Sequence, residues 1–228
     1  MALLKEIVYD IKNIIRGGIQ SDDDIISDRQ IEFQVHSLRA QFIRQDINKR
    51  RSISDNIKQL IYCLEVETVS GSTCGLSDDI MIVRSKKKVP SSVETAHQNL
   101  VTAIGPTGIL SANFHMIPYN RAPWAGNNRY TKNMTFGFLL DGFLGPEAEL
   151  LENVKVEGVW QDPTMIGDYT KTDGSVCYDV DKDEYPLSTS MLDLIKQAML
   201  AQNLQPMIQM PTDSSNNAKS DVQPNMQK

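Results

Sequence analysis

The chain has 228 residues, of which 40% are hydrophobic and 23% charged, and its formal net charge is −6. This composition is typical of a globular protein with one large domain or two small ones. No apolar run approaches the roughly 20 residues of a transmembrane helix, and the charged start of the chain leads us to expect no signal peptide. Cys63, Cys74 and Cys177 are widely spaced, so we expect reduced thiols rather than a disulfide framework or a zinc site.

Two amphipathic helices are predicted for the N-terminal segment. Residues 2–16 carry apolar side chains at helical spacing, and Gly17-Gly18 ends the pattern. Ser27 followed by Gln30 fits a capping box and predicts the start of a second helix, over residues 27–49. The apolar stripe of this second helix consists of Ile31, Val35, Leu38 and Phe42.

The second helix also carries apolar side chains away from that stripe. At about 100° per residue, Phe33 and Ala40 fall nearly opposite it, and Arg29 and Arg44 also point away from it. We expect this helix to be sandwiched, with a second partner from the same chain or from a neighbouring subunit. Arg29, Phe33 and Arg44 are therefore candidate subunit-contact residues. His36, on the flank of the helix, is interpreted as a surface or interface residue.

The hydrophobic period changes near residue 60. Residues 60–69 alternate between apolar and polar side chains, as a half-buried strand does. Glycine-containing turns separate the segments that follow. Further strands are predicted at residues 80–83, 100–104, 134–140 and 154–160.

Helical spacing returns before the C-terminus, with Ser188 or Ser190 available as the cap. After Pro206 the chain is polar and without aromatic residues, so we expect disorder there. The predicted fold is α+β, with N- and C-terminal helices packed together and an inserted β-rich block of the sandwich or hairpin type. The predicted segments are a helical segment (1–59), the β-rich block (60–162), an acidic loop with the closing helix (163–205) and a disordered tail (206–228).

Charge is distributed unevenly along the chain. Residues 141–184 contain twelve acidic and three basic residues, whereas residues 1–140 contain seventeen basic and fourteen acidic residues. Two interpretations remain open at this stage. The two parts attract each other, within a monomer or between copies, or they are independently solvated surfaces.

No catalytic or metal-binding motif is recognisable. The sequence lacks a Walker A loop, a dinucleotide-binding glycine motif and a nucleophile elbow. Asp179, Asp181 and Asp183 imitate the start of a calcium loop, but Glu184 and Ser190 replace the glycine and glutamate that such a loop requires. We therefore expect no enzymatic activity, no cofactor and no metal.

Two basic clusters are the candidate sites for contact with DNA or a partner. Several cations in a short run neutralise phosphates without reading bases, although solvated loop tips explain them equally well. No aromatic residue interleaves with either cluster, which argues against stacking on single-stranded nucleic acid. The clusters are Lys49, Arg50 and Arg51, and Lys86, Lys87 and Lys88.

Four segments in a fixed order resemble head–tail connector proteins of crAss-like and related short-tailed bacteriophages. "ISDRQIEFQVHSLRAQFIRQDINKRRSI" (26–53) resembles their N-terminal helical segment, and "IPYNRAPWAGNNRYTKN" (117–133) their long β-hairpin region. "VKVEGVWQDPTMI" (154–166) is similar to their strand that ends in an Asp-Pro turn, and "DEYPLSTSMLDLIKQAML" (183–200) to their closing helix. The likeness covers roughly residues 20–205.

This resemblance implies a structural adaptor or ring protein docked under the portal, of roughly twelve copies. The implied partners are further copies of the chain, the portal protein, other tail or ring proteins and passing double-stranded DNA held non-specifically, with no membrane. The implied location is the virion, after assembly in the host cytoplasm, with the acidic block away from the DNA. The alternative is a non-enzymatic nucleic-acid-binding accessory protein, against which the acidic pI of about 5.1 argues.

Overall fold

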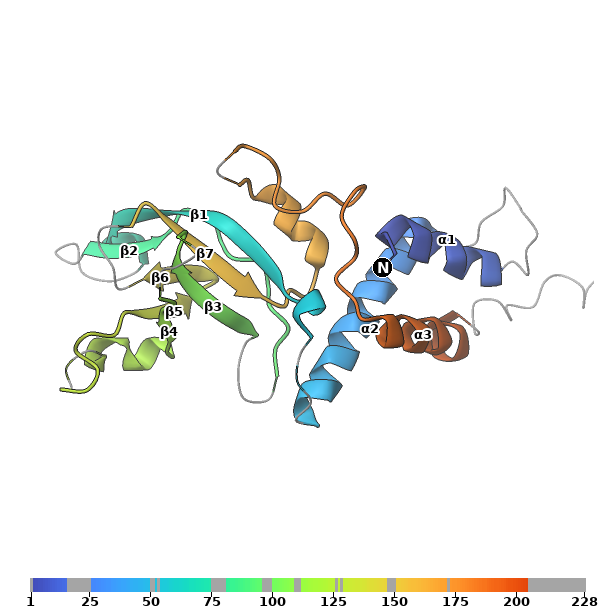
Figure 1. Ribbon diagram of the computed structural model, residues 1–228, viewed down its shortest axis with the longest axis horizontal. Coiled ribbons are helices and arrows are strands. Elements are labelled where there is room, and N and C mark those ends of the chain that lie inside the picture. Colours follow the sequence, from blue (N-terminus) through green and yellow to red (C-terminus); the bar gives the residue numbers. More distant parts are fainter. Residues whose placement is uncertain are drawn as a thin grey trace, which may run out of the picture.

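The computed structural model describes residues 2–15, 26–49, 52, 54–74, 81–95, 100–108, 112–125, 127, 129–146, 151–171 and 173–204. Helices from both ends of the chain lie together at one end of an elongated molecule, and the strands form the other end (Figure 1). The predicted α+β class, with a β-rich block inserted between N- and C-terminal helices, is confirmed. The predicted disordered tail, residues 206–228, lies outside the described residues.

In the part of the chain that the structure describes, three α-helices form the helical end of the molecule. The Ser27 hydroxyl accepts a hydrogen bond from the Gln30 backbone N–H at 3.3 Å, so the predicted cap of the second helix is confirmed. Among the described residues, no helix is both long and apolar enough to cross a membrane. The helices are α1 (Leu4–Ile15), α2 (Asp28–Asn48) and α3 (Thr189–Ala198), and a π-helical turn (Met199–Leu204) continues α3.

The apolar stripe of α2 packs in the helical core, but its end differs from the prediction. Ile31, Val35 and Leu38 are buried as expected. Phe42 is only partly buried against this core, whereas its neighbour Ile43 is 2% exposed. Ile43 lies on the side of α2 that also carries the buried residues Arg39 and Ala40, so the last turns of the helix are buried on a side that the predicted stripe does not include.

Within the described ranges, seven strands form two sheets. The first sheet has four strands in the order β2-β1-β7-β3, all antiparallel, and the second has three in the order β4-β5-β6. The five predicted strands are all present, and β4 and β6 are additional. The strands are β1 (Gln59–Ser70), β2 (Met81–Ser85), β3 (Val101–Pro106), β4 (His115–Met116), β5 (Phe136–Leu140), β6 (Phe143–Pro146) and β7 (Asn153–Gly158).

The two sheets meet at both edges, so that they surround one apolar core in the manner of a partly open barrel. A bridge between Ile104 and Phe114 joins β3 to the start of β4. On the other side, the Leu144 backbone N–H of β6 donates to the buried Ser85 hydroxyl of β2 at 3.0 Å, and that hydroxyl donates to the Lys87 carbonyl. A sandwich or a hairpin was expected for this block. In the structure, the block consists of two sheets that join at both edges around one core.

The segment expected to be a long β-hairpin, residues 117–133, has a different structure. Its described residues include a 3₁₀-helix over Tyr119–Trp124, and the strands on either side, β4 and β5, are parallel and not antiparallel. The tight hairpin lies just after it, between β5 and β6. There Asp141 and Gly142 adopt φ angles of 51° and 82°, the left-handed pair that a two-residue hairpin turn requires.

Arg39 lies buried between the helical end and the β-block. Its guanidinium donates to the carbonyls of Trp160 at 2.7 Å, Pro186 at 2.7 Å and Ile57 at 3.2 Å, and it lies over the Tyr185 ring. Burial lowers the pKa of Arg39 from its ordinary value. An arginine nonetheless stays protonated in proteins, so three carbonyl dipoles solvate this buried charge.

We predict that Arg39→Met lowers the free energy of unfolding by about 3–5 kcal/mol. The substitution keeps much of the side-chain volume but leaves three buried carbonyls without donors, at about 1–3 kcal/mol for each group. Arg29→Met, at an exposed position of the same helix, is the control and should change stability by no more than about 0.5 kcal/mol. Urea unfolding of the variants measures both values, and equal effects would show that Arg39 does not hold the two ends together.

His36 has a partner within its own chain. Its Nδ1 lies 2.7 Å from the Tyr185 hydroxyl, and its Nε2 lies 3.6 Å from the Asp162 carboxylate. Burial lowers the pKa of His36, and the Asp162 charge opposes this effect only in part. The expectation that His36 is a surface or interface residue is wrong, because the side chain is largely covered by its own chain.

The lowered pKa of His36 predicts a pH dependence of stability. Between the ordinary histidine pKa of about 6.5 and the lower folded value, the unfolded chain binds the proton more readily than the folded one. The free energy of unfolding should therefore fall as the pH falls below about 6.5 and be constant above it. Urea unfolding at pH 5.5 and 7.5 should show a larger loss for the wild type than for His36→Gln. Equal losses would contradict the assignment.

Candidate functional site

The candidate subunit-contact residues lie on one exposed stripe of α2. Arg29, Phe33 and Arg44 are all exposed, and Phe33 retains 69% of its accessible surface. Their spacing of four and eleven residues places them on the same side of the helix. The structure therefore groups these three side chains as the sequence predicted, and the opposite side of α2 faces the helical core.

The second apolar face of α2 is covered by the same chain only at one end. Ala40 is 6% exposed and belongs to the same core as Val93 and Val159 from the β-block. Arg44, although exposed, donates from Nε to the Glu94 carbonyl at 2.8 Å. The C-terminal half of α2 is thus sandwiched within the monomer, whereas Phe33, in its N-terminal half, is left facing solvent.

The two predicted basic clusters do not form one patch. Lys49 is exposed at the end of α2, at the lower edge of Figure 1, and Arg50 and Arg51 lie outside the described residues. Lys87 donates to the Asp168 carbonyl at 2.9 Å, in the 3₁₀-helix Pro163–Asp168 near the upper edge. Lys49 and Lys87 therefore lie in different parts of the molecule.

Lys86, Lys87 and Lys88 each interact with their own chain. Lys86 forms a salt bridge of 2.7 Å with Glu65, which raises the pKa of Lys86, and the Lys88 ammonium lies over the Phe143 ring. All three side chains are nevertheless exposed. Exposed pairs of this kind are weak, so these lysines can still bind a phosphate. Within the structure, their interactions attach the loop after β2 to its surroundings.

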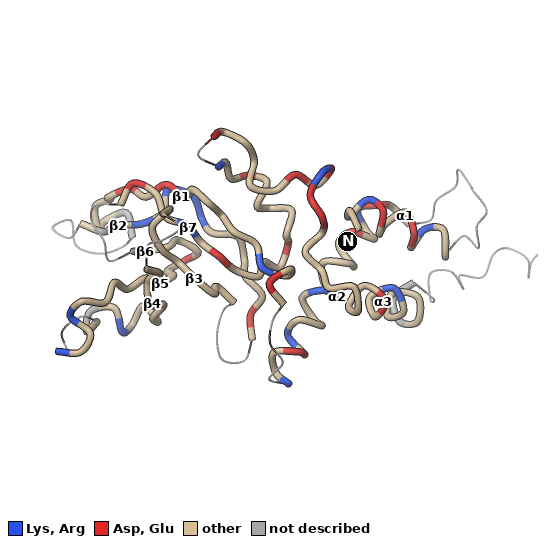
Figure 2. The backbone as a smooth tube through the Cα atoms, in the orientation of Figure 1, with Lys and Arg blue, Asp and Glu red and all other residues tan. Residues whose placement is uncertain are grey.

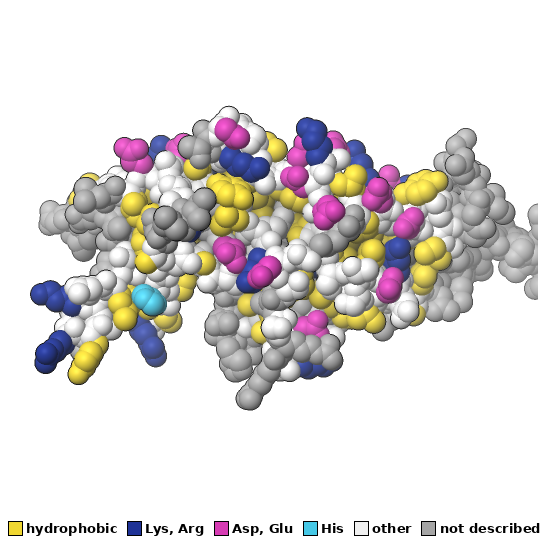
Figure 3. All heavy atoms as spheres, viewed as in Figure 1, with side chains coloured by type: hydrophobic (Ala, Val, Ile, Leu, Met, Phe, Trp, Pro, Cys, Tyr) yellow, Lys and Arg dark blue, Asp and Glu magenta, His cyan; other side chains and the backbone are white. Residues whose placement is uncertain are grey.

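A further exposed surface lies between β4 and β5, in residues 118–133, which we call the tip. Its described side chains include Trp124 at 77% and Tyr130 at 82% exposure, together with the exposed cations Arg121, Arg129 and Lys132. Figure 3 shows the tip at the lower left, where basic and apolar side chains project from the molecule. Residues 95–140 contain no Asp or Glu at all, and this interleaved pattern is the signal that sequence reasoning missed.

Aromatic packing holds the base of the tip against the second sheet. The Tyr119 ring lies 5.4 Å from the Phe138 ring of β5, measured between centroids. Phe138 pairs with Gly145 of β6, where a Cβ would lie only 2.5 Å from the Phe138 ring. The glycine therefore makes room for the ring that supports Tyr119, and Tyr119 begins the 3₁₀-helix of the tip.

The acidic segment forms a second distinctive surface, on the opposite edge of the molecule. Acidic positions are marked along the chain between β7 and α3 in Figure 2, and acidic side chains lie along the upper edge of the surface in Figure 3. Within it, the Asp183 carboxylate accepts from the Asp179 backbone N–H, and Asp181 pairs with Lys5. Among the described residues, no group of three or more His, Cys, Asp or Glu side chains could hold a metal ion.

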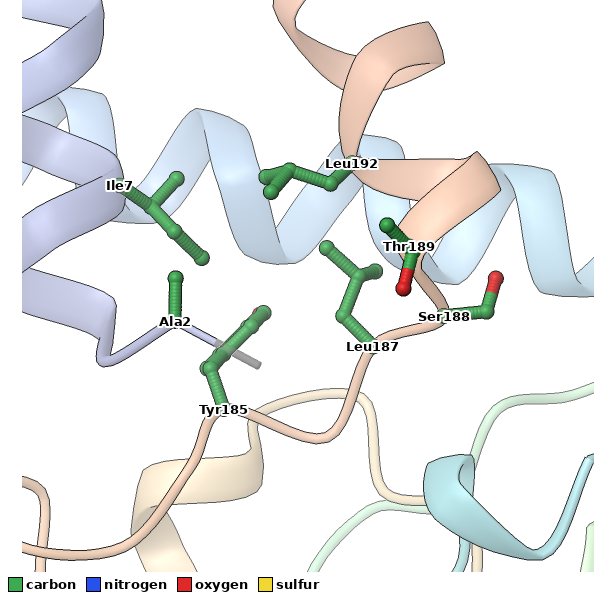
Figure 4. A pocket seen from close by; sticks show the side chains of 7 residues that line it. All are labelled: Ala2, Ile7, Tyr185, Leu187, Ser188, Thr189 and Leu192. Carbon is green, nitrogen blue, oxygen red and sulfur yellow. The ribbon is translucent and has the colours of Figure 1, made fainter.

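A small apolar hollow lies where α1, the closing segment and α3 meet (Figure 4). Ile7 and Leu192 point toward each other across it from α1 and α3, and Leu187 lies below them. Its polar groups are the hydroxyls of Ser188, Thr189 and Tyr185. Burial raises the pKa of Tyr185 far above its ordinary value, so that phenol remains neutral and supplies no base at ordinary pH.

The sequence matches a family model described as phage tail ring protein 2 over residues 6–222. A search of curated proteins finds no match. The family match begins at the third residue of α1 and extends across α2, α3, both sheets, the tip and the acidic residues between β7 and α3.

Proposed function

Since the chain belongs to the phage tail ring protein 2 family, we propose that it forms a closed ring of identical subunits in the head–tail connector, below the portal. The match confirms the resemblance to ring proteins of crAss-like phages that the sequence motifs indicated. Membership makes the chain a structural component of the phage tail and hence of the virion. We propose, beyond this membership, that the ring is closed, that it lies in the connector and that DNA passes through it.

The exposure of Phe33 is the observation that carries the proposed self-assembly. A phenylalanine that is 69% exposed on a well-formed helix gains nothing from folding of the monomer. Arg29 lies one turn from it on the same exposed side of α2, and arginine with a large aromatic is typical of interface centres. We infer that this stripe of α2 packs against a neighbouring subunit.

A ring of roughly twelve copies with head-to-tail contacts fits this inference. Its neighbours along the tail would be the portal protein and other tail proteins, and its assembly would take place in the host cytoplasm. The role is structural and needs no catalytic group. Double-stranded DNA would pass through the ring, held by scattered cations and without base recognition.

Phe33 and Ile31 form a matched pair that tests the assembly role of α2. Ile31 is fully buried, so Ile31→Ala should lower the free energy of unfolding by about 2–5 kcal/mol. Phe33→Ala should leave it within about 0.5 kcal/mol, yet reduce the yield of rings when the chain is co-expressed with its portal protein. Native mass spectrometry of the complex measures the number of copies, and normal rings with Phe33→Ala would place the contact elsewhere.

The free subunit should bind duplex DNA only weakly. A ring through which DNA slides cannot hold it tightly, and the lysines after β2 already interact with their own chain. We expect a dissociation constant at physiological salt no tighter than about 10⁻⁴–10⁻⁶ M, weakening further with salt. Fluorescence anisotropy with a labelled duplex at two salt concentrations measures it. Nanomolar binding, or preference for one sequence over a scrambled one, would favour a nucleic-acid-binding accessory protein instead.

A further inference from the structure

The composition of the tip is that of the centre of a protein–protein interface. Trp124 and Tyr130 expose more than three quarters of their surface, beside Arg121 and Arg129. Tryptophan, tyrosine and arginine are the residues most enriched where binding energy concentrates. These aromatic side chains would gain little from contact with duplex DNA, because its bases are already stacked within the double helix. Stacking of bases on aromatic side chains is typical of single-stranded nucleic acid.

The charge of the tip specifies an acidic partner. Its three cations have no salt-bridge partner among the described residues, and no acidic residue occurs between residues 95 and 140. A complementary surface would carry several carboxylates next to apolar side chains that the tip aromatics could cover. Both the charge and the apolar component must therefore be present on the partner.

The chain itself carries a surface that combines carboxylates with exposed apolar side chains, which we call the acidic ridge. Met165 at 48% and Val176 at 43% exposure supply apolar area on it. The ridge lies along the upper edge of the molecule, whereas the tip projects at the lower left (Figures 1 and 3). The exposed acids of the ridge are Asp168, Asp173, Asp181, Asp183 and Glu184.

Two complementary surfaces on opposite edges of one subunit cannot meet within that subunit, but they can meet between successive copies. A cyclic ring requires this arrangement, in which one surface of each subunit contacts a different surface of the next. We propose that the tip of each subunit docks on the acidic ridge of the next copy around the ring. This inference rests on the ring assembly proposed above and names the surfaces that form its interface.

Reversing the charge of each surface tests the proposal. The tip variant combines Arg121→Glu, Arg129→Glu and Lys132→Glu. The ridge variant combines Asp168→Lys, Asp181→Lys and Glu184→Lys, and so spares the carboxylates of Asp173, Asp179 and Asp183, which accept backbone hydrogen bonds within their own turns. Arg121→Lys with Arg129→Lys preserves charge and is the control. Thermal melting checks that each variant folds, and native mass spectrometry after co-expression with the portal protein measures rings.

Each charge-reversed variant alone should lose at least tenfold in ring yield, because its tip and ridge then carry the same sign. An equal mixture of the two variants should recover rings, in which tip and ridge variants alternate and the copy number is even. The charge-preserving control should assemble like the wild type. If the ridge variant unfolds, the tip variant combined with Trp124→Ala still decides whether the tip is needed.

The outcomes separate this inference from the proposed function. Wild-type chain that forms no ring on the portal would contradict ring assembly itself. Wild-type rings that persist with the tip variant, or a failure of the mixture to recover rings from two folded variants, would overturn the docking of tip on ridge. Loss of duplex binding by a tip variant that still forms normal rings would show that the tip meets DNA, and this too would overturn it.

Discussion

Arg39 carries a positive charge into the interior, where the carbonyls of Ile57, Trp160 and Pro186 solvate it. These three carbonyls come from the entry to the β-block, its exit and the segment that leads to α3. One planar guanidinium can satisfy all three only if the segments keep a fixed arrangement around it. Val93, Leu100 and Val159 of the β-block also belong to the buried core of the helical end, so this bond set and an apolar contact together join the two ends.

The protein buries several aromatic residues, Trp160 and Tyr185 among them, but leaves others exposed. Phe33, Trp124 and Tyr130 each expose well over half of their surface, although the described chain has two well-formed apolar cores. Phe33 lies within α2 and Trp124 at the end of the 3₁₀-helix Tyr119–Trp124, whereas Tyr130 lies in the turns that follow. Such side chains are expected in a subunit whose remaining apolar surface is covered by assembly. The acidic ridge on the other edge supplies the opposite charge.

Local patterns in the sequence predicted much of the fold. Helical and alternating periods located α1, α2, α3 and the five longer strands, and the Ser27 cap follows from residue types alone. β4 and β6 were missed because they have only two and four residues, too few to show a period. The burial of Arg39 and the partner of His36 could not be foreseen, since the groups that bind them lie more than a hundred residues away in sequence, apart from Ile57. The tip was overlooked because its aromatics and cations are spaced irregularly in the sequence, so no helical or alternating period marks them.

We propose that this chain closes into a ring on the tail axis. Cryo-electron microscopy of the virion, with the structure fitted into the density below the portal, tests it most directly. The account predicts a single closed ring of identical subunits, roughly twelve in number, with the exposed stripe of α2 and the tip both buried between neighbours. A single copy of the chain, an open filament, or a ring in which Phe33 and Trp124 both face solvent would contradict it.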